Sequence, residues 1–384
     1  MAARTLETAI PFQLDRAVDP RMAGEFGKAM DDSGVVDHIM AWDQLVSWNP
    51  RSLWKPENTP LANVMKDCDS YADVFVLAAI AAATSNIGIM VSADAIRRGP
   101  AELTQTMLTL AGATKGKAIL MLGAGEQKQC KPYGHKRSEG LDRMEDFFEI
   151  NQLLTGATDP FNYEGHHTTY KNAWIGEAAP YRPRVHALGG GPRLLDMAAK
   201  YADGYSFAVP SVFTRAEQFH EVAKKLREQV ERNGRDPDAF EFSVWFGGCM
   251  HEDPEMIERA KQNAILKWMA ATIGRLDQQH WIDEGVEPAY PIGWHYALKL
   301  LPAELSREQA EEVLAKVSPK MMDQAFCYGT AADVAAYAQG FVDAGATQVS
   351  VIDILPMALM PVEEQLTALS RSIEVCRILK EKNA

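Results

Sequence analysis

Short apolar stretches alternate with helix-forming stretches along most of the chain, and this alternation most constrains the fold. Buried strands are predicted, in chain order, at residues 9–14, 35–42, 86–91, 117–122, 184–188, 204–208, 240–246 and 348–355. Segments with helical spacing or a capping residue follow most of them. Because strands that alternate with helices form parallel sheets, eight such units favour a closed (β/α)8 TIM barrel. A doubly wound open sheet with a small second domain is the alternative.

The length of the chain suits one large barrel with insertions. No break in composition and no flexible linker divides its 384 residues, so we expect residues 1–384 to form a single barrel domain. Two segments exceed a minimal barrel, at about 155–182 and 253–328. The first is predicted as a hairpin or a long loop. The second is rich in aromatic residues, and we expect it to cover the substrate end of the barrel.

Charge and composition restrict the partners and the compartment. The formal net charge of −13 argues against nucleic-acid binding, so a small-molecule substrate is expected. The five cysteines are scattered and form no CxxC pair, and we predict neither disulfides nor a metal site. The apolar stretches are too short to span a membrane, and the first residues lack the apolar core of a signal peptide. We therefore expect a cytoplasmic location.

The most informative candidate site lies where the strand at 117–122 ends in Gly123-Ala124-Gly125-Glu126. Glycines allow a ligand to approach the backbone, and a carboxyl group stands at the rim. In a TIM barrel, active sites lie at this end of the strands. Further polar residues at strand ends are Asp43, Ser92, Asp94 and Asp353. Each of these residues could equally cap a helix or face solvent.

A second candidate site is the turn Gly189-Gly190-Gly191, which joins a strand to a helix opened by Pro192. Free N–H groups and the positive end of the helix dipole make such a turn suitable for a phosphate. Basic residues also follow two other strands, namely Arg97 with Arg98 and the segment 128–137. An anionic ligand tail would explain both clusters, and a solvated loop surface explains them equally well.

Three segments together resemble the bacterial luciferase-like superfamily. They are NIGIMVSADAIRRGPAELTQTMLTLAGATKGKAILMLGAGEQ, GGGPRLLDMAAKYADGYSF and FCYGTAADVAAYAQGFVDAGATQVSVI. The chain is most similar to the branch that uses the deazaflavin coenzyme F420, including the phthiodiolone ketoreductases, which share Pro132-Tyr133-Gly134 after the glutamate. The resemblance implies a TIM barrel, usually a homodimer, that holds F420 in its mouth.

The resemblance also implies roles for individual residues. The implied cofactor-binding residues are Asp43, Met90, Val91, Ser92, Gly125, Gly189, Gly190 and Gly191, and the implied catalytic residues are Glu126, Gln44 and Trp48. Met90-Val91-Ser92 would form a bulge, often with a non-prolyl cis peptide, behind the deazaflavin ring. The glycine turn would hold the phosphate, and Glu126 would face the substrate near the reactive carbon.

One departure from the family narrows the range of reactions that the site could carry out. Where the F420-dependent dehydrogenases carry Asp-His, this chain has Asp43-Gln44, and an amide cannot take a proton from an alcohol. Reduction of a ketone or alkene, with Glu126 as proton donor, is therefore favoured, although His295 could substitute for the missing histidine. Residues 207–211 lack the lysine that binds the sugar phosphate in the F420-dependent glucose-6-phosphate dehydrogenases. We therefore expect an apolar or bulky substrate.

The first hypothesis is therefore an F420-dependent oxidoreductase. It would transfer a hydride between the deazaflavin and a carbonyl, an alcohol or an activated alkene. An FMN-dependent luciferase-like monooxygenase is the alternative, and a non-catalytic cofactor-binding member of the fold is a third hypothesis. The residues leave the substrate and the direction of the reaction open.

Overall fold

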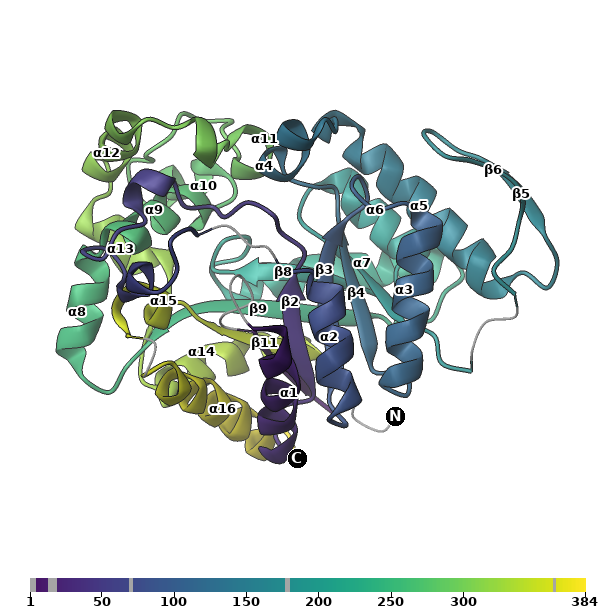
Figure 1. Ribbon diagram of the computed structural model, residues 1–384, viewed down its shortest axis with the longest axis horizontal. Helices are drawn as coiled ribbons and strands as arrows, with labels where there is room; N and C mark the ends of the chain where they lie inside the picture. The colour runs from purple at the N-terminus through teal and green to yellow at the C-terminus, as the bar shows by residue number, and fades with distance from the viewer. Residues whose placement is uncertain (1–4, 13–18, 69–71, 177–179, 362–363) are drawn as a thin grey trace.

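The computed structural model describes residues 5–12, 19–68, 72–176, 180–361 and 364–384. Within these residues, eight parallel strands close into a barrel, as the sequence predicted (Figure 1). The barrel strands are β1 (Glu7–Pro11), β2 (His38–Trp42), β3 (Gly88–Asp94), β4 (Ala118–Gly123), β7 (Arg184–Leu188), β8 (Gly204–Val209), β9 (Glu241–Met250) and β11 (Gln348–Asp353). The ring closes because β11 pairs with both β9 and β1, and β8 pairs with β9. The predicted first strand extended to residue 14, and residues 13 and 14 lie outside the described part.

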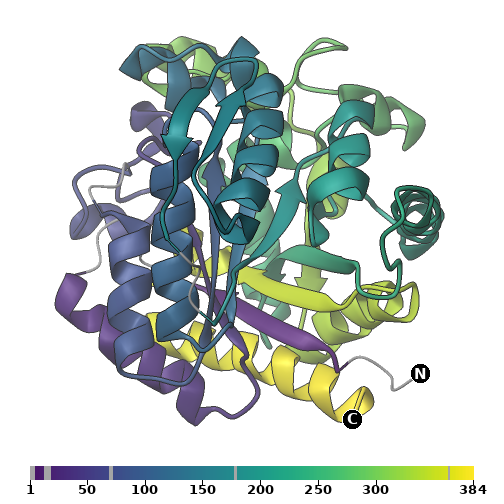
Figure 2. The same ribbon diagram turned by 90° about the vertical axis from the view of Figure 1, so that its right-hand side faces the viewer.

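Helices follow the strands and cover the outside of the barrel (Figure 2). They are α1 (Ala23–Asp32), α2 (Val74–Ala83), α3 (Pro100–Ala113), α5 (Gly140–Gly156), α6 (Pro192–Tyr201), α7 (Ala216–Arg232), α14 (Ala331–Asp343) and α16 (Gln365–Lys382). A capping box starts α14, since Thr330 N donates to Asp333 Oδ2 (2.8 Å) and Asp333 N donates to Thr330 Oγ1 (3.3 Å). The last helix was predicted from residue 361 and begins at Gln365.

The two segments that exceed a minimal barrel fold as separate additions. The first forms an antiparallel hairpin of β5 (Phe161–Glu164) and β6 (Thr169–Ala173), which projects from the barrel (Figure 1). The second contains α8 (Pro254–Gln262), α9 (Ala264–Ile273), α10 (Gln278–Asp283), α11 (Tyr296–Lys299), α12 (Arg307–Ala315) and α13 (Pro319–Ala325). It ends in a short strand, β10 (Cys327–Gly329), which was not predicted and pairs with the end of β9.

Shorter elements complete the connections between the strands. Two helices, α4 (Gln127–Cys130) and α15 (Leu355–Leu359), follow β4 and β11. Short 3-10 turns lie at Pro20–Met22, Arg51–Leu53, Pro60–Asn63, Lys131–Tyr133, Arg137–Glu139 and Pro302–Glu304. Among the described residues, no helix combines the length and the apolarity that crossing a membrane requires.

The apolar runs of the barrel strands are buried on both faces. On β4, Leu120 and Leu122 belong to the cluster between strands and helices, whereas Ile119 and Met121 belong to the cluster inside the barrel. Successive side chains of a strand point to opposite faces, so both halves of an unbroken apolar run find a core. This is the reason that the strands read as continuous apolar runs rather than as an alternating pattern.

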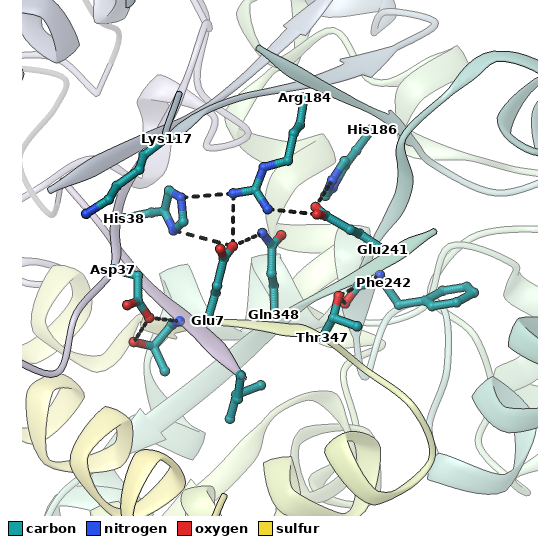
Figure 3. A network of polar contacts seen from close by, with 12 residues as sticks. Glu7, Asp37, His38, Lys117, Arg184, His186, Glu241, Phe242, Thr347 and Gln348 are labelled. Atoms are coloured by element: carbon teal, nitrogen blue, oxygen red, sulfur yellow. Dashed lines mark hydrogen bonds and ion pairs between the residues drawn. The ribbon is translucent and has the colours of Figure 1, made fainter. Parts of the chain in front are cut away.

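A polar network fills the opposite end of the barrel, where the strands begin (Figure 3). Arg184 lies at its centre, with Nη2 3.0 Å from Glu7 Oε2 and Nη1 2.8 Å from Glu241 Oε1. The second carboxylate oxygen of Glu241 lies 2.8 Å from His186 Nε2, and His38 Nε2 is 3.3 Å from Arg184 Nη2. Residues of four strands thus tie the amino-terminal end of the barrel together.

The long insertion has an apolar cluster that it shares with the barrel loops. Its members include Trp281 and Met321 from the insertion, Trp54 and Leu61 from the loop after β2, and Leu355 from α15. Figure 1 shows the insertion helices at the same end of the barrel as α4. The insertion therefore packs beside the carboxyl ends of the strands, where the candidate site was predicted.

Candidate active site

Many of the predicted site residues line one cavity at the carboxyl ends of the barrel strands. Its volume of about 540 Å³ lies within the range of small-molecule sites. The predicted residues that line it are Asp43, Gln44, Trp48, Ser92, Gly125, Glu126, Gly189 and Gly190. They come from β3 and from the segments after β2, β4 and β7. The strand-end candidates Asp94 and Asp353 line it as well.

Met90, Val91 and Gly191 lie outside the lining of this cavity as the described residues define it. Met90 is fully buried in the cluster inside the barrel, and Val91 is buried in the cluster between strands and helices. The expected bulge at these positions is absent, because β3 pairs with β4 without interruption from Ile89 to Asp94. Among the described residues, the one cis peptide bond joins Val209 to Pro210.

The two arginines after β3 are bound to carboxylates. Arg97 Nη2 lies 3.1 Å and Arg98 Nε lies 2.9 Å from Asp43 Oδ2. Arg97 also pairs with Asp94, and Arg98 Nη2 lies 3.2 Å from Asp73 Oδ2. Binding of an anionic ligand tail by these arginines stays a prediction, and in the structure their partners are carboxylates. Their charges fix Asp43 at the rim of the cavity.

Glu126 forms an ion pair that the sequence analysis did not predict. Lys128 Nζ lies 2.7 Å from Glu126 Oε2, and the Lys128 side chain is only 1% exposed. The same nitrogen donates to Val46 O (2.9 Å) and lies 4.8 Å from the centre of the Trp48 ring. Gln129 also donates to Val46 O, at 2.7 Å. Helix α4 therefore holds the loop after β2 against Glu126, which brings Trp48 to the same side of the cavity.

The insertion adds two residues next to Glu126. Figure 1 shows α11 beside α4, and Tyr296 at the start of α11 donates its hydroxyl hydrogen bond to Glu126. Burial, the negative charge of Glu126 and this hydrogen bond raise the pKa of Tyr296 well above its ordinary value. Tyr296 therefore keeps its proton at physiological pH.

His295 is the other residue from the insertion, and its ring stacks on Tyr296 at a centroid distance of 5.3 Å. Its Nδ1 accepts a hydrogen bond from Ala297 N (3.1 Å), so the neutral ring carries its proton on Nε2. Burial and the charge of Arg137 lower the pKa of His295. Since its basic nitrogen is occupied, His295 is better suited to donate a hydrogen bond than to replace the histidine missing beside Asp43.

The glycine turn before α6 has the geometry of an anion site. Gly189 and Gly191 adopt φ angles of 133° and 108°, which favour glycine. A side chain at Gly190 or Gly191 would meet no atom within 4 Å, so the backbone faces open space. No side chain caps the helix at Gly191. Arg193 turns away, and its Nη1 lies 2.7 Å from Asp142 Oδ1.

Three residues at the site were not predicted there: Lys128 and Tyr296, which contact Glu126, and Arg137, which lines the cavity. Lys128 and Arg137 were grouped with a basic loop, because lysine and arginine are usually exposed. Tyr296 belongs to the insertion that is rich in aromatic residues, and the spacing of these residues does not indicate which one reaches the cavity. Within the described part of the chain, no three His, Cys, Asp or Glu side chains are grouped as metal ligands would be.

A closed parallel barrel with a ligand cavity at the carboxyl ends of its strands is the arrangement of TIM-barrel enzymes. The chain belongs to the luciferase-like monooxygenase family, whose family model matches residues 54–348. This match confirms the resemblance to the luciferase-like superfamily that the sequence segments indicated.

Similar curated proteins are oxidoreductases. A phthiodiolone/phenolphthiodiolone dimycocerosates ketoreductase of Mycobacterium kansasii is 28% identical over 309 residues, which cover 78% of this chain and 82% of the relative. An F420-dependent glucose-6-phosphate dehydrogenase of Kineococcus radiotolerans is 23% identical over 328 residues, which cover 83% of this chain and 82% of the relative. These relatives support an oxidoreductase.

Solved structures share the fold at low sequence identity. An F420-dependent secondary alcohol dehydrogenase in complex with an F420–acetone adduct has a TM-score of 0.70 and 16% identity over 98% of each chain. A long-chain alkane monooxygenase has a TM-score of 0.65 and 12% identity over 99% of this chain and 91% of that chain. The same barrel thus carries more than one kind of redox chemistry.

Proposed function

We propose that the protein is an F420-dependent oxidoreductase that acts on the carbonyl or alcohol group, or the activated alkene, of an apolar or bulky substrate. The names of its relatives and structural neighbours support the coenzyme. The observation that carries the proposal is the cavity in which Glu126, Trp48 and Gln44 meet the glycine turn before α6. When bound there, F420 would supply or accept a hydride.

The residues present fit a flat ring system with a phosphate-bearing tail. Trp42 and Trp245 line the cavity with their ring centres 6.3 Å apart, and Trp245 Nε1 is buried without a hydrogen-bond partner among the described residues. The ring would lie near Ser92 and Gly125, and the open backbone of residues 189–191 would hold the phosphate. Asp43, which Arg97 and Arg98 fix in place, would contact the ring or the chain that follows it.

We propose that Glu126 exchanges the proton with the oxygen of the substrate. A protonated Glu126 no longer forms an ion pair with Lys128, so proton uptake from an alcohol costs this contact and proton donation to a ketone restores it. The reductive direction starts from protonated Glu126, and in that state Lys128 keeps the carbonyl oxygen of Val46 as a partner. Gln44 can orient the substrate oxygen by hydrogen bonding but cannot remove a proton from it.

The wall formed by the insertion supports an apolar substrate. Its side chains in the cavity include Met269, Ile273, Leu276, Leu298 and Phe326. An apolar ligand buries its surface against such a wall and gains about 25 cal/mol for each Å² removed from water.

The experiment that tests this proposal is a titration of the purified apo-protein with F420 and, separately, with FMN. We expect saturable quenching of F420 fluorescence at micromolar concentration or below, and weak binding of FMN. A structural neighbour, a riboflavin lyase solved with modified FMN, favours FMN as the alternative, and other neighbours are monooxygenases. Tight FMN binding without F420 binding would replace the first proposal with a flavin-dependent monooxygenase.

We also propose that the protein is a homodimer, as the family resemblance implies. Exposed apolar side chains after β6, namely Trp174 and Ile175, are consistent with an interface in this region. Light scattering coupled to size exclusion should give twice the chain mass of 42.5 kDa. A mass of one chain at micromolar concentration would contradict the proposal.

A further inference from the structure

The cations around the cavity differ in whether a carboxylate pairs with them. Arg97 and Arg98 pair with Asp43, and Lys128 pairs with Glu126. Arg137 also lines the cavity, yet within the described residues its side chain makes no ion pair and no hydrogen bond. Its Nε is buried and has no partner. Arg137 is therefore a cation at the cavity wall that lacks a carboxylate.

Arg137 is partly buried, and its enclosed Nε–H group is costly because it has lost water without gaining a hydrogen bond. Burial lowers the pKa of Arg137, although nearby Cys130 and Glu126 oppose this effect. For Arg97, by contrast, Asp94 and Asp43 outweigh burial and raise the pKa. A protein retains such an unpaired guanidinium most readily where a ligand supplies the counter-charge.

A second donor lies beside Arg137. Since His295 Nδ1 accepts from Ala297 N, the proton of the neutral ring is on Nε2. Both side chains line the cavity, and the charge of Arg137 contributes to the lowered pKa of His295. The nearby carboxylate of Glu126 is already bound to Lys128 and Tyr296.

We propose that Arg137, with His295, binds an anionic group, a carboxylate or a phosphate, of a molecule that the cavity holds. The two side chains would supply N–H donors to its oxygens, while the apolar wall near Leu298 and Phe326 would contact its body. The anion has two sources, the substrate or the coenzyme. The inference deepens the proposed function and rests on it only where the coenzyme is the source.

Binding of decanoate and of decan-1-ol to the apo-protein, measured by calorimetry, tests the substrate source. The two probes have the same chain length and differ in charge. We expect wild-type protein to bind decanoate about tenfold more tightly, which is the effect of a charge-assisted hydrogen bond. Arg137→Gln should remove this difference, and Arg137→Lys should retain part of it. A fluorescence titration with F420 on the same variants tests the coenzyme source.

Arg143→Gln is the matched control, since Arg143 lies on α5 and pairs with Glu139 at 2.9 Å. A tenfold loss of affinity in Arg137→Gln for decanoate assigns the anion to the substrate, and the same loss for F420 assigns it to the coenzyme. The proposal is overturned if Arg137→Gln weakens neither probe, or if Arg143→Gln has the same effect. The wild-type preference for decanoate over decan-1-ol remains a test even if Arg137→Gln does not fold. Decanoate binding without F420 binding would refute the proposed coenzyme and leave this inference standing.

Discussion

The ion pair between Glu126 and Lys128 sets the conditions under which Glu126 can move a proton. The pair places a buried ammonium group 2.7 Å from the carboxylate that the proposed reaction uses. In the direction of alcohol oxidation, the ion pair is lost when the carboxylate accepts the proton. In the direction of reduction, the reaction starts with the pair broken, and the pair forms again when Glu126 donates its proton. The proton-donor role that the sequence suggested for Glu126 stays a prediction, and the structure adds this condition to it.

We predict that Glu126→Gln lowers kcat by about 10²–10⁴-fold, because the amide cannot exchange a proton with the substrate. The affinity for F420, measured by fluorescence titration, should stay within a factor of two or so of the wild type, since the substitution keeps the shape of the side chain. Glu304→Gln is the control, because Glu304 is exposed and pairs with Lys131. An unchanged kcat in Glu126→Gln would show that another group moves the proton.

The carboxyl group of Asp353, at the end of β11, is buried, and burial favours its neutral form over its charged form. Burial raises its pKa to about 7, although the N–H groups of Met250 and Leu355 oppose this effect. Because the pKa in the folded protein exceeds the ordinary value of 3.8, Asp353 favours the folded state at low pH. This contribution is lost as the pH rises through about 7.

Asp353→Asn should therefore be more stable than the wild type at pH 8 or so, by a free energy of unfolding on the order of 1–4 kcal/mol. Near pH 4, where Asp353 is protonated in the folded protein, the difference should vanish. Thermal unfolding across this pH range measures both values, with exposed Asp343→Asn as the control. A difference of the same size at both values of pH would contradict the prediction.

At the scale of elements, apolar runs predicted the strands well, because the barrel strands are buried on both faces. Helices that begin with a capping residue were also predicted well, as the capping box of Thr330 and Asp333 illustrates. The strand β10 was missed because three residues carry no periodicity. The bulge expected at residues 90–92 came from the family and not from these residues, and the regular pairing of β3 excludes it.

The candidate site was predictable where it depends on the ends of strands, and not where it depends on the insertion. Glu126 and Gly189 follow apolar runs, so the fold alone places them at one rim. Tyr296 and His295 reach that rim through packing between α11 and α4, which no local pattern encodes. Arg137 reaches it from the 3-10 turn Arg137–Glu139. The pairing of Lys128 with Glu126 likewise depends on burial that only the folded chain creates.

Helix α9 supports the loop that carries Trp48. Trp268 Nε1 on α9 donates to Trp48 O at 2.7 Å, and Trp268 is fully buried. We predict that Trp268→Phe lowers the free energy of unfolding by about 1–3 kcal/mol, because the carbonyl of Trp48 loses its buried partner. It should also raise KM, since the loop loses an anchor. Chemical denaturation and steady-state kinetics measure the two effects.

Val76→Ala provides the control for Trp268→Phe, because Val76 is 55% exposed and lies on α2, away from α9. It should change neither the stability nor KM. A Trp268→Phe variant that loses stability with an unchanged KM would show that the contact with Trp48 serves the packing of the insertion and not the site.

At the scale of the whole molecule, the two ends of the barrel differ in structure and in chemistry. The carboxyl ends of the strands surround a cavity, and the amino ends are closed by the network around Arg184 (Figure 3). The insertion shares an apolar cluster with the barrel loops, which supports the expectation of a single domain. That expectation stays a prediction, and a single cooperative unfolding transition would support it.

The network at the amino ends should control stability in acid. Although burial opposes ionisation, His186 and Arg184 lower the pKa of Glu241 to about 2, below its ordinary value of 4.5. The stabilisation by Glu241 is therefore present above pH 4.5 and is lost as the pH falls towards 2. Burial lowers the pKa of His38 to about 4, so between pH 6.5 and 4 the unfolded chain takes up a proton that the folded barrel excludes. Both groups thus weaken the fold as the pH falls.

We predict that Glu241→Gln lowers Tm at pH 7 or so, because Arg184 keeps its charge at the centre of the network and loses a carboxylate. As the pH falls from 4.5 towards 2, the wild type should lose this advantage and the two Tm values should converge. Glu221→Gln on the exposed face of α7 is the control and should follow the wild type at every pH. A difference in Tm that stays constant down to about pH 2 would show that Glu241 stabilises the barrel by packing alone, because a contribution from its charge must disappear once the carboxyl group is protonated in the folded chain.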